Sequence, residues 1–185
     1  MVEMATRTSS LSGLHGGSSA VRLEAAPAAE RISLRVRAED VFALSGALGV
    51  DLPVKPKTSA SANGRTALWL GPDEWLVIGG GYDIGNSLMQ AAANSGALHS
   101  ATDVSQRNVA ILVSGPRAAA AINAGCPQDL SLKAFPVGAC SRTIFGKIEI
   151  VLLRTAEDAF RVEVWRSFSD YAFGLLAEGA RDAAL

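Results

Sequence analysis

Cysteine and histidine are scarce in this chain. It holds two cysteines, Cys126 and Cys140, and two histidines, His15 and His99. Two cysteines are too few for a disulfide scaffold, and they lack the Cys-x-x-Cys spacing of zinc and redox sites. Two histidines far apart in the sequence give little material for a metal site or a histidine-based catalytic triad. We therefore interpret both cysteines as small buried side chains.

An excess of charge of one sign is also missing, because seventeen basic and eighteen acidic residues give a net charge of −1. This balance argues against a sequence-wide electrostatic footprint for nucleic acid or a membrane surface. No apolar run approaches the ~20 residues that span a bilayer, and the N-terminus lacks the continuous apolar region of a signal peptide. The sequence therefore predicts a soluble cytoplasmic protein that binds neither nucleic acid nor membrane.

The motifs of common nucleotide-binding and hydrolytic sites are absent as well. The chain has no Gly-x-Gly-x-x-Gly after a strand, no Gly-x-x-x-x-Gly-Lys-[Ser/Thr] and no Gly-x-Ser-x-Gly. Little in the sequence therefore points to catalysis by this chain.

The chain does have enough apolar material for a core. Its 185 residues are 49% hydrophobic, which fits one domain or two small packed halves. Residues 1–30 are rich in Ser, Gly and Ala without a period, so we predict a flexible N-terminal tail or, alternatively, a loose wrapping arm. Residues 31–185 are predicted to form a single compact domain of two pseudo-repeats, about 31–98 and 99–180.

Each predicted half has the same order of elements: strand, helix, loop, paired strands and helix. In the first half, alternation from Arg31 predicts a half-buried strand, Gly49 ends a helix, and Gly71-Pro72-Asp73-Glu74 forms a hairpin turn. In the second half, strands are expected over residues 142–145, 147–154 and 159–165, before a final helix. The pattern predicts an α+β fold of two pseudo-duplicated strand-helix-strand-strand-helix halves with antiparallel sheets.

One polar cluster stands at the start of the second half. The spacing of Asp103, Ser105 and Arg107 places them on one face of an expected strand. Such a cluster could orient a ligand or a partner loop. The alternatives are a solvated strand face, or an Asp–Arg pair at the junction of the two halves.

Tryptophans and arginines supply the candidates for partner binding. Trp is enriched as an anchor at protein interfaces, and the arginines lie near the starts of elements, although surface arginines are usually solvated. If Phe160, Val162 and Val164 point to the core, Trp165 points outward, unless a helix or loop covers that face. The candidates are Trp69, Trp75, Arg117, Arg142, Trp165 and Arg166.

Short segments, in order over about residues 65–176, resemble the gamma subunit family of heterotetrameric sarcosine oxidase. Each segment is modest alone, and the ordered set is fairly specific. The segments are Leu68-Trp69-Leu70-Gly71-Pro72-Asp73-Glu74-Trp75-Leu76, Asp103-Val104-Ser105-Gln106-Arg107, Ser114-Gly115-Pro116-Arg117-Ala118, Gly125-Cys126-Pro127-Gln128-Asp129-Leu130, Phe135-Pro136-Val137-Gly138-Ala139-Cys140-Ser141-Arg142-Thr143 and Arg166-Ser167-Phe168-Ser169-Asp170-Tyr171.

The same stretch is more distantly similar to the folate-binding fold of the glycine-cleavage T-protein superfamily. The aminomethyltransferases of that superfamily carry an Asp-Asp pair in a strand, where a carboxylate engages folate. Here that pair falls on Glu149-Ile150. The resemblance therefore implies the fold more strongly than the chemistry. Its folate-pocket-like positions are Asp103, Ser105, Arg107 and Glu149.

The resemblance implies a small, non-catalytic subunit of a four-chain oxidase. That complex oxidises sarcosine with oxygen to glycine, hydrogen peroxide and a one-carbon unit that tetrahydrofolate captures. FAD, FMN, NAD, zinc and tetrahydrofolate are then expected on the partner subunits, and none on this chain alone. The partners would be the alpha, beta and delta subunits, chiefly alpha. The alternatives are a stand-alone folate-binding aminomethyltransferase-like protein that uses Glu149, and a general binding module.

Overall fold

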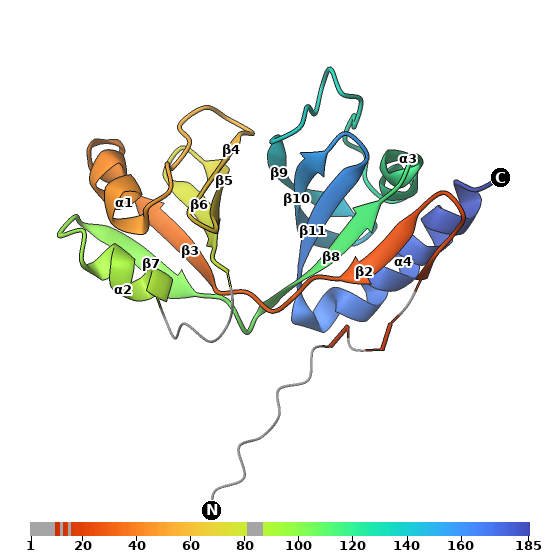
Figure 1. The fold of residues 1–185 in the computed structure, drawn as a ribbon, viewed down its shortest axis with the longest axis horizontal. Helices are drawn as coiled ribbons and strands as arrows, with labels where there is room; N and C mark the ends of the chain where they lie inside the picture. The colour runs from red at the N-terminus through yellow and green to blue at the C-terminus, as the bar shows by residue number, and fades with distance from the viewer. Residues whose placement is uncertain (1–9, 12, 15, 81–86) are drawn as a thin grey trace, which may run out of the picture.

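The chain folds into four layers, in which two antiparallel sheets lie face to face and helices cover the outer side of each sheet (Figure 1). The computed structural model describes residues 10–11, 13–14, 16–80 and 87–185. The α+β class with antiparallel sheets that the sequence predicts is confirmed.

Strands outnumber helices along the chain. The strands are β1 (Gly16–Gly17), β2 (Arg22–Ala25), β3 (Arg31–Val36), β4 (Ser59–Ala62), β5 (Arg65–Gly71), β6 (Glu74–Ile78), β7 (His99–Asp103), β8 (Asn108–Ser114), β9 (Cys140–Phe145), β10 (Ile148–Ala156) and β11 (Ala159–Trp165). The helices are α1 (Val41–Leu48), α2 (Ser87–Ala93), α3 (Ala118–Asn123) and α4 (Ser169–Asp182).

The first sheet runs in the order β4-β5-β6-β3-β7, and α1 and α2 cover its outer face. Alternation along β3 turns Ile32 and Leu34 toward these helices, where they join Trp75 and Val77 of β6 in one core. The hairpin between β5 and β6 forms at the predicted turn. Helix α1 ends where predicted, at Gly49, whose φ of 63° is a left-handed conformation that glycine adopts without strain.

The second sheet runs in the order β1-β2-β8-β11-β10-β9, and α3 and α4 cover its outer face. Phe160, Val162 and Val164 of β11 point into this core, which is the condition under which the sequence predicts an outward Trp165. Side chains at the alternate positions of β11 therefore point toward the first sheet. Strand β10 is buried on both faces and reads as a nearly continuous apolar run.

A smaller apolar cluster joins the inner faces of the two sheets. Its members are Ala29, Leu68, Leu76, Ile78, Val104, Cys140, Val151 and Leu153. The two sheets are also joined just before β4 and β9, where Thr58 forms an isolated β-bridge with Ala139. These contacts place the polar inner face of β11 against the first sheet, which sets up the site described below.

The two sheets exchange strands along the chain. Strand β2 precedes β3 in the chain but pairs with β8 of the second sheet, while β7 pairs with β3 of the first sheet before the chain enters β8. The connections over residues 26–30 and 104–107 cross side by side (Figure 1). They are tied together by hydrogen bonds from Val104 N to Arg31 O (2.9 Å) and from Arg31 N to Ser105 Oγ (2.8 Å).

The flexible tail expected over residues 1–30 is not what the structure has for its described part. Residues 16–17 and 22–25 form strands of the second sheet, and Leu11, Val21 and Leu23 are buried in its core. Strand β8 supplies the hydrogen-bond partners that hold β2 in the sheet. The Ser/Gly/Ala-rich composition of this segment gave no sign of that pairing. The rest of the expected tail, residues 1–9, 12 and 15, lies outside the described residues.

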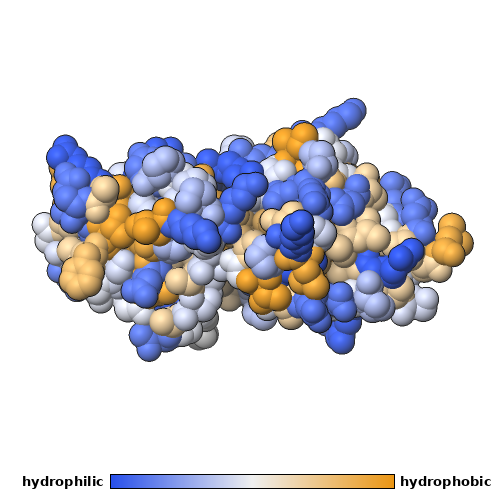
Figure 2. All heavy atoms as spheres, turned by 90° about the horizontal axis from the view of Figure 1, so that it is seen from above, coloured by the Kyte–Doolittle hydropathy of each residue, from blue (hydrophilic) through white to orange (hydrophobic). Residues whose placement is uncertain are grey.

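The surface of the molecule mixes polar and apolar side chains. Seen from above in Figure 2, hydrophobic side chains occur as separate groups between hydrophilic ones on this face. Among the described residues, the large hydrophobic side chains that are exposed are Phe42, Val54, Leu98, Leu132, Val137, Ile144, Trp165, Phe168, Tyr171 and Leu185. In the described part of the chain, no helix is long and apolar enough to cross a membrane.

Cys140 lies in the cluster between the sheets, as the interpretation of a buried side chain requires. Its thiol donates to Thr58 O (3.2 Å) and Trp69 O (3.5 Å). Burial raises the pKa of the Cys140 thiol from 9.0 to about 11. A thiol that must stay neutral in the folded chain favours folding below pH 9.0 and loses that contribution as the pH rises to about 11.

We therefore expect the urea midpoint of unfolding to fall more steeply for the wild type than for Cys140→Ala as the pH rises from 9.0 to about 11. The comparison uses matched titrations in the presence of a reductant. Cys126→Ala is the control, because Cys126 is buried in the other core cluster. Parallel pH profiles for the wild type and Cys140→Ala would contradict the assignment.

Candidate functional site between the two sheets

A cleft of about 220 Å³ lies where the inner faces of the two sheets diverge. The first sheet contributes side chains from β3, β5 and β6, and the second from β8 to β11 and from the connection that precedes β8. Most of the lining is charged or polar. The residues are Ser33, Leu70, Glu74, Leu76, Arg107, Asn108, Arg142, Glu149, Ile150, Val151, Glu163 and Trp165.

A buried ion-pair network forms the floor of the cleft. The carboxylate of Glu163 accepts hydrogen bonds from Arg31 Nε and from Arg161 Nε, each at 2.8 Å. Glu163 and Arg31 are 1% and 2% exposed. Arg31 also donates from Nη1 to Ala29 O (2.9 Å), so the group ties β11 to the crossing connection. Removing one member of a buried ion pair leaves the other charge uncompensated in the interior, which destabilises the fold.

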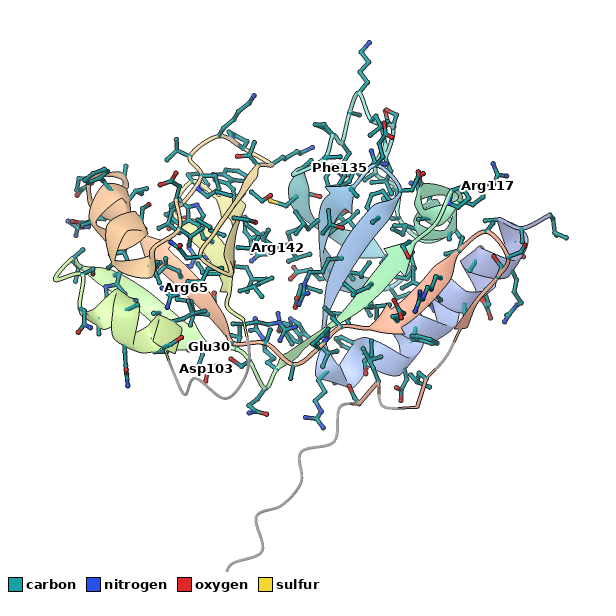
Figure 3. All side chains as sticks on the ribbon, viewed as in Figure 1. Glu30, Arg65, Asp103, Arg117, Phe135 and Arg142 are labelled. Atoms are coloured by element: carbon teal, nitrogen blue, oxygen red, sulfur yellow. The ribbon has the colours of Figure 1, made fainter. Side chains whose placement is uncertain are left out.

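A second network spans the cleft from one sheet to the other. Arg142 of β9 reaches Glu74 of β6 with two hydrogen bonds, one of them at 3.2 Å from Nη1 (Figure 3). Arg35 donates to the same carboxylate at 3.0 Å, and Glu149 lies 3.6 Å from Arg142 Nε. Hydrogen bonding to Glu74 raises the pKa of Arg142, so the cation is held in its charged form.

Arg107 and Trp165 form the mouth of the cleft. The Arg107 guanidinium lies over the Trp165 ring, 5.1 Å from its centroid, and its Nε donates to Asn108 Oδ1 at 3.1 Å. The Trp165 ring stacks on Phe168, with 6.1 Å between centroids and 20° between planes. Trp165 is 42% exposed, as its predicted outward orientation requires.

The polar cluster predicted on one strand face is arranged differently. Asp103 ends β7, whereas Ser105 and Arg107 lie in the turn before β8. The Asp103 carboxylate accepts from the backbone N–H of Ser105 at 2.8 Å and from its hydroxyl. A side chain that caps its own turn satisfies the backbone locally, so the extended strand expected through this segment breaks here. Asp103 and Ser105 support the crossing, and Arg107 is the member that reaches the cleft.

The remaining predicted partner-binding residues are scattered. Trp75 is 1% exposed and donates from Nε1 to Pro53 O (2.8 Å), so the interpretation of Trp75 as a surface anchor is wrong. Trp69 is half-buried beside it. Arg117 is exposed at the start of α3 and donates to Ala183 O (3.1 Å), far from the cleft (Figure 3). Arg166 is exposed directly after Trp165.

One known protein family matches most of the chain. The family model described as "Sarcosine oxidase, gamma subunit family" matches residues 36–182. The chain belongs to this family. The match includes every residue of the cleft apart from Ser33.

Relatives of the gamma subunit family agree with this assignment. The chain is 35% identical over 122 residues to the sarcosine oxidase subunit gamma of Arthrobacter sp., covering 65% of this chain and 59% of that protein. It is 31% identical to the subunit gamma of Corynebacterium sp. (strain P-1), covering 77% and 70%. The aligned segment thus spans little more than half of the Arthrobacter relative.

Two solved structures have the same fold as this chain. A chain of the heterotetrameric sarcosine oxidase from Corynebacterium sp. U-96, in complex with pyrrole 2-carboxylate, matches with a TM-score of 0.85 and 26% identity over 97% of both chains. The aminomethyltransferase T of the glycine cleavage system from Bartonella henselae matches with a TM-score of 0.65 and 18% identity, covering 88% of this chain and 49% of that chain. The predicted T-protein-like fold is confirmed.

Four residues named from the sequence line this cleft, namely Arg107 and Glu149 from the folate-pocket-like positions and Arg142 and Trp165 from the partner-binding candidates. Sequence reasoning missed the others. Glu163 was the most informative omission, because it alternates in phase with Trp165 on the polar face of β11. Glu74 was noted only as part of a turn. Within the described residues, no group of three or more His, Cys, Asp or Glu side chains could hold a metal ion.

Proposed function

We propose that this chain is the gamma subunit of a heterotetrameric sarcosine oxidase, an enzyme that oxidatively demethylates sarcosine to glycine with release of hydrogen peroxide and a one-carbon unit. The observation that carries the proposal is the match over 97% of both chains to a chain of the Corynebacterium oxidase. Under this proposal the alpha, beta and delta subunits are its partners, chiefly alpha, and they hold FAD, FMN, NAD, zinc and tetrahydrofolate.

The state of the cleft supports a non-catalytic role for this subunit. General acid–base work needs a titratable group whose proton can move at working pH. The carboxylates of Glu74 and Glu163 are held by arginines, and Glu149 lies beside Arg142. The lining found among the described residues includes neither histidine nor cysteine. Side chains paired in this way can hold two sheets together, which is the work of a structural subunit.

The stand-alone folate-binding alternative fits the cleft poorly. A cavity of about 220 Å³ is smaller than the ~300–1,000 Å³ of sites that enclose drug-sized ligands. The hydrogen-bonded pair of Arg142 and Glu74 lines this cavity from both sheets. Glu149, the carboxylate that would engage folate, lies beside Arg142 and is exposed. These residues do not fit a folate.

The test is a mild affinity purification of the tagged chain from its own cells grown on sarcosine. We expect three co-purifying chains and flavin absorbance near ~450 nm, because redox cofactors would arrive with the other subunits. Colourless protein without partners, from cells with verified oxidase activity, would overturn the proposal. Calorimetric titration with tetrahydrofolate serves as the second arm, and heat of binding to the isolated chain would favour the alternative.

A further inference from the structure

Arg107 differs from the other arginines around the cleft in having no acidic partner among the described residues. Arg142 and Arg31 are committed to Glu74 and Glu163. Arg107, in contrast, uses only its Nε, which donates to Asn108. In the described part of the chain, its two terminal amino groups donate no hydrogen bond and no carboxylate lies within ion-pair distance. Four N–H bonds of the fork are thus available.

The Arg107 guanidinium is held in place by its neighbours, so the side chain would lose little conformational entropy on binding an anion. The Trp165 ring supports one face of the guanidinium at 5.1 Å from the ring centroid. Asn108, 6% exposed and paired across the sheet with Trp165, holds the Nε side. The backbone N–H of Arg166 donates to Arg107 O, which anchors the turn to the end of β11. Pre-organised groups bind with a smaller entropic cost than free side chains.

The surface around the Arg107 guanidinium carries the residue types that are typical of hot spots at protein interfaces. Trp165 and Phe168 stack on each other and are 42% and 40% exposed. Trp and Arg dominate the residues that carry binding energy at protein interfaces, and an exposed stacked pair gains most when a partner removes it from water. A guanidinium beside such a pair selects a planar anion, because its N–H groups match the two oxygens of a carboxylate.

We propose that the Arg107–Trp165–Phe168 stack receives an aspartate or glutamate side chain from the partner subunit that docks at the mouth of the cleft. The inference rests on the proposed function, since it names the point of contact between this chain and its oxidase. The carboxylates that line the cleft are paired within the chain, chiefly with Arg142 and Arg31, so an ion pair of the exposed Arg107 would take its anion from another chain. The aromatic pair then packs against the apolar stem of the incoming segment.

The test co-expresses the four subunits with Arg107→Gln, Arg107→Lys or Trp165→Ala in this chain. The retention of the chain on the flavin-bearing complex is measured by size-exclusion chromatography over a dilution series. We expect Arg107→Gln and Trp165→Ala to raise the apparent dissociation constant at least tenfold, which is the effect of losing an interface hot spot. Arg107→Lys should recover only part of the affinity, because a lysine cannot reproduce the planar fork.

Arg181→Gln is the matched control, because it removes an exposed arginine in the last turn of α4 that does not line the cleft. Selective loss for Arg107→Gln, with wild-type retention for Arg181→Gln and unchanged melting temperatures of the isolated chains, supports the inference. Normal assembly of Arg107→Gln overturns it and leaves the proposed function in place. Equal losses for both variants also overturn it, because net charge would then suffice. A wild-type chain that binds no flavoprotein overturns both proposals.

Discussion

Replacing Glu163 with glutamine is expected to lower the free energy of unfolding by about 3–5 kcal/mol, the cost of removing one partner from a buried ion pair. Glutamine keeps nearly the same shape but carries no charge. The guanidinium groups of Arg31 and Arg161, whose Nε atoms lie 2.8 Å from the carboxylate, would stay in the interior without a counter-charge. Urea unfolding followed by far-UV circular dichroism measures the change.

An exposed ion pair provides the control for this variant. Glu24 pairs with Arg22 on β2, and both side chains are largely exposed. Since exposed pairs contribute about 0–1 kcal/mol, Glu24→Gln should leave the free energy of unfolding almost unchanged. A loss for Glu163→Gln as small as that for Glu24→Gln would mean that the network does not hold the two sheets together.

Replacing Trp75 with alanine is expected to cost about 3–5 kcal/mol in unfolding free energy, because it empties the largest side chain of the first core. For a domain of this size, that loss corresponds to a fall of about 10 °C in melting temperature. The variant also removes the hydrogen bond from Nε1 to Pro53 O, which holds the loop after α1. Thermal unfolding of the purified chain measures the effect.

Two further variants separate the contributions at this position. Trp75→Phe keeps a ring in the core but loses the indole N–H, so we expect about 1–2 kcal/mol. Trp69→Ala truncates the residue directly opposite on β5, which is only half-buried, and should cost less than Trp75→Ala. Equal costs for the two tryptophans would contradict the assignment of Trp75 to the core and Trp69 to its edge.

The parts of the fold that the sequence could predict are those set by local pattern. Period-two alternation placed Phe160 and Val162 inside and Trp165 outside, and the turn residues Pro72 and Asp73 marked a hairpin. Both signals act between residues a few positions apart. They therefore survive in a single sequence, and the α+β class with antiparallel sheets followed from them.

The candidate site depends on contacts that no local pattern contains. Arg31 and Glu163 meet across 132 positions, so each looked like an ordinary surface charge on an alternating strand. The face that carries Glu163 is polar by pattern and becomes buried only because the first sheet covers it. Likewise, the Asp103 to Arg107 spacing suited a strand, and the bond from Ser105 to Asp103 made it a turn.

The exchange of strands between the sheets has a consequence for biosynthesis. A chain leaves the ribosome from its N-terminus, and sequences that emerge early usually fold early. The first sheet can close once Asp103 has emerged, since all its strands lie between residues 31 and 103. Strand β2 emerges before all of these, yet its partner β8 follows them. The edge of β2 that pairs with β8 therefore stays unpaired while every strand of the first sheet is synthesised, although β2 itself is translated before all of them.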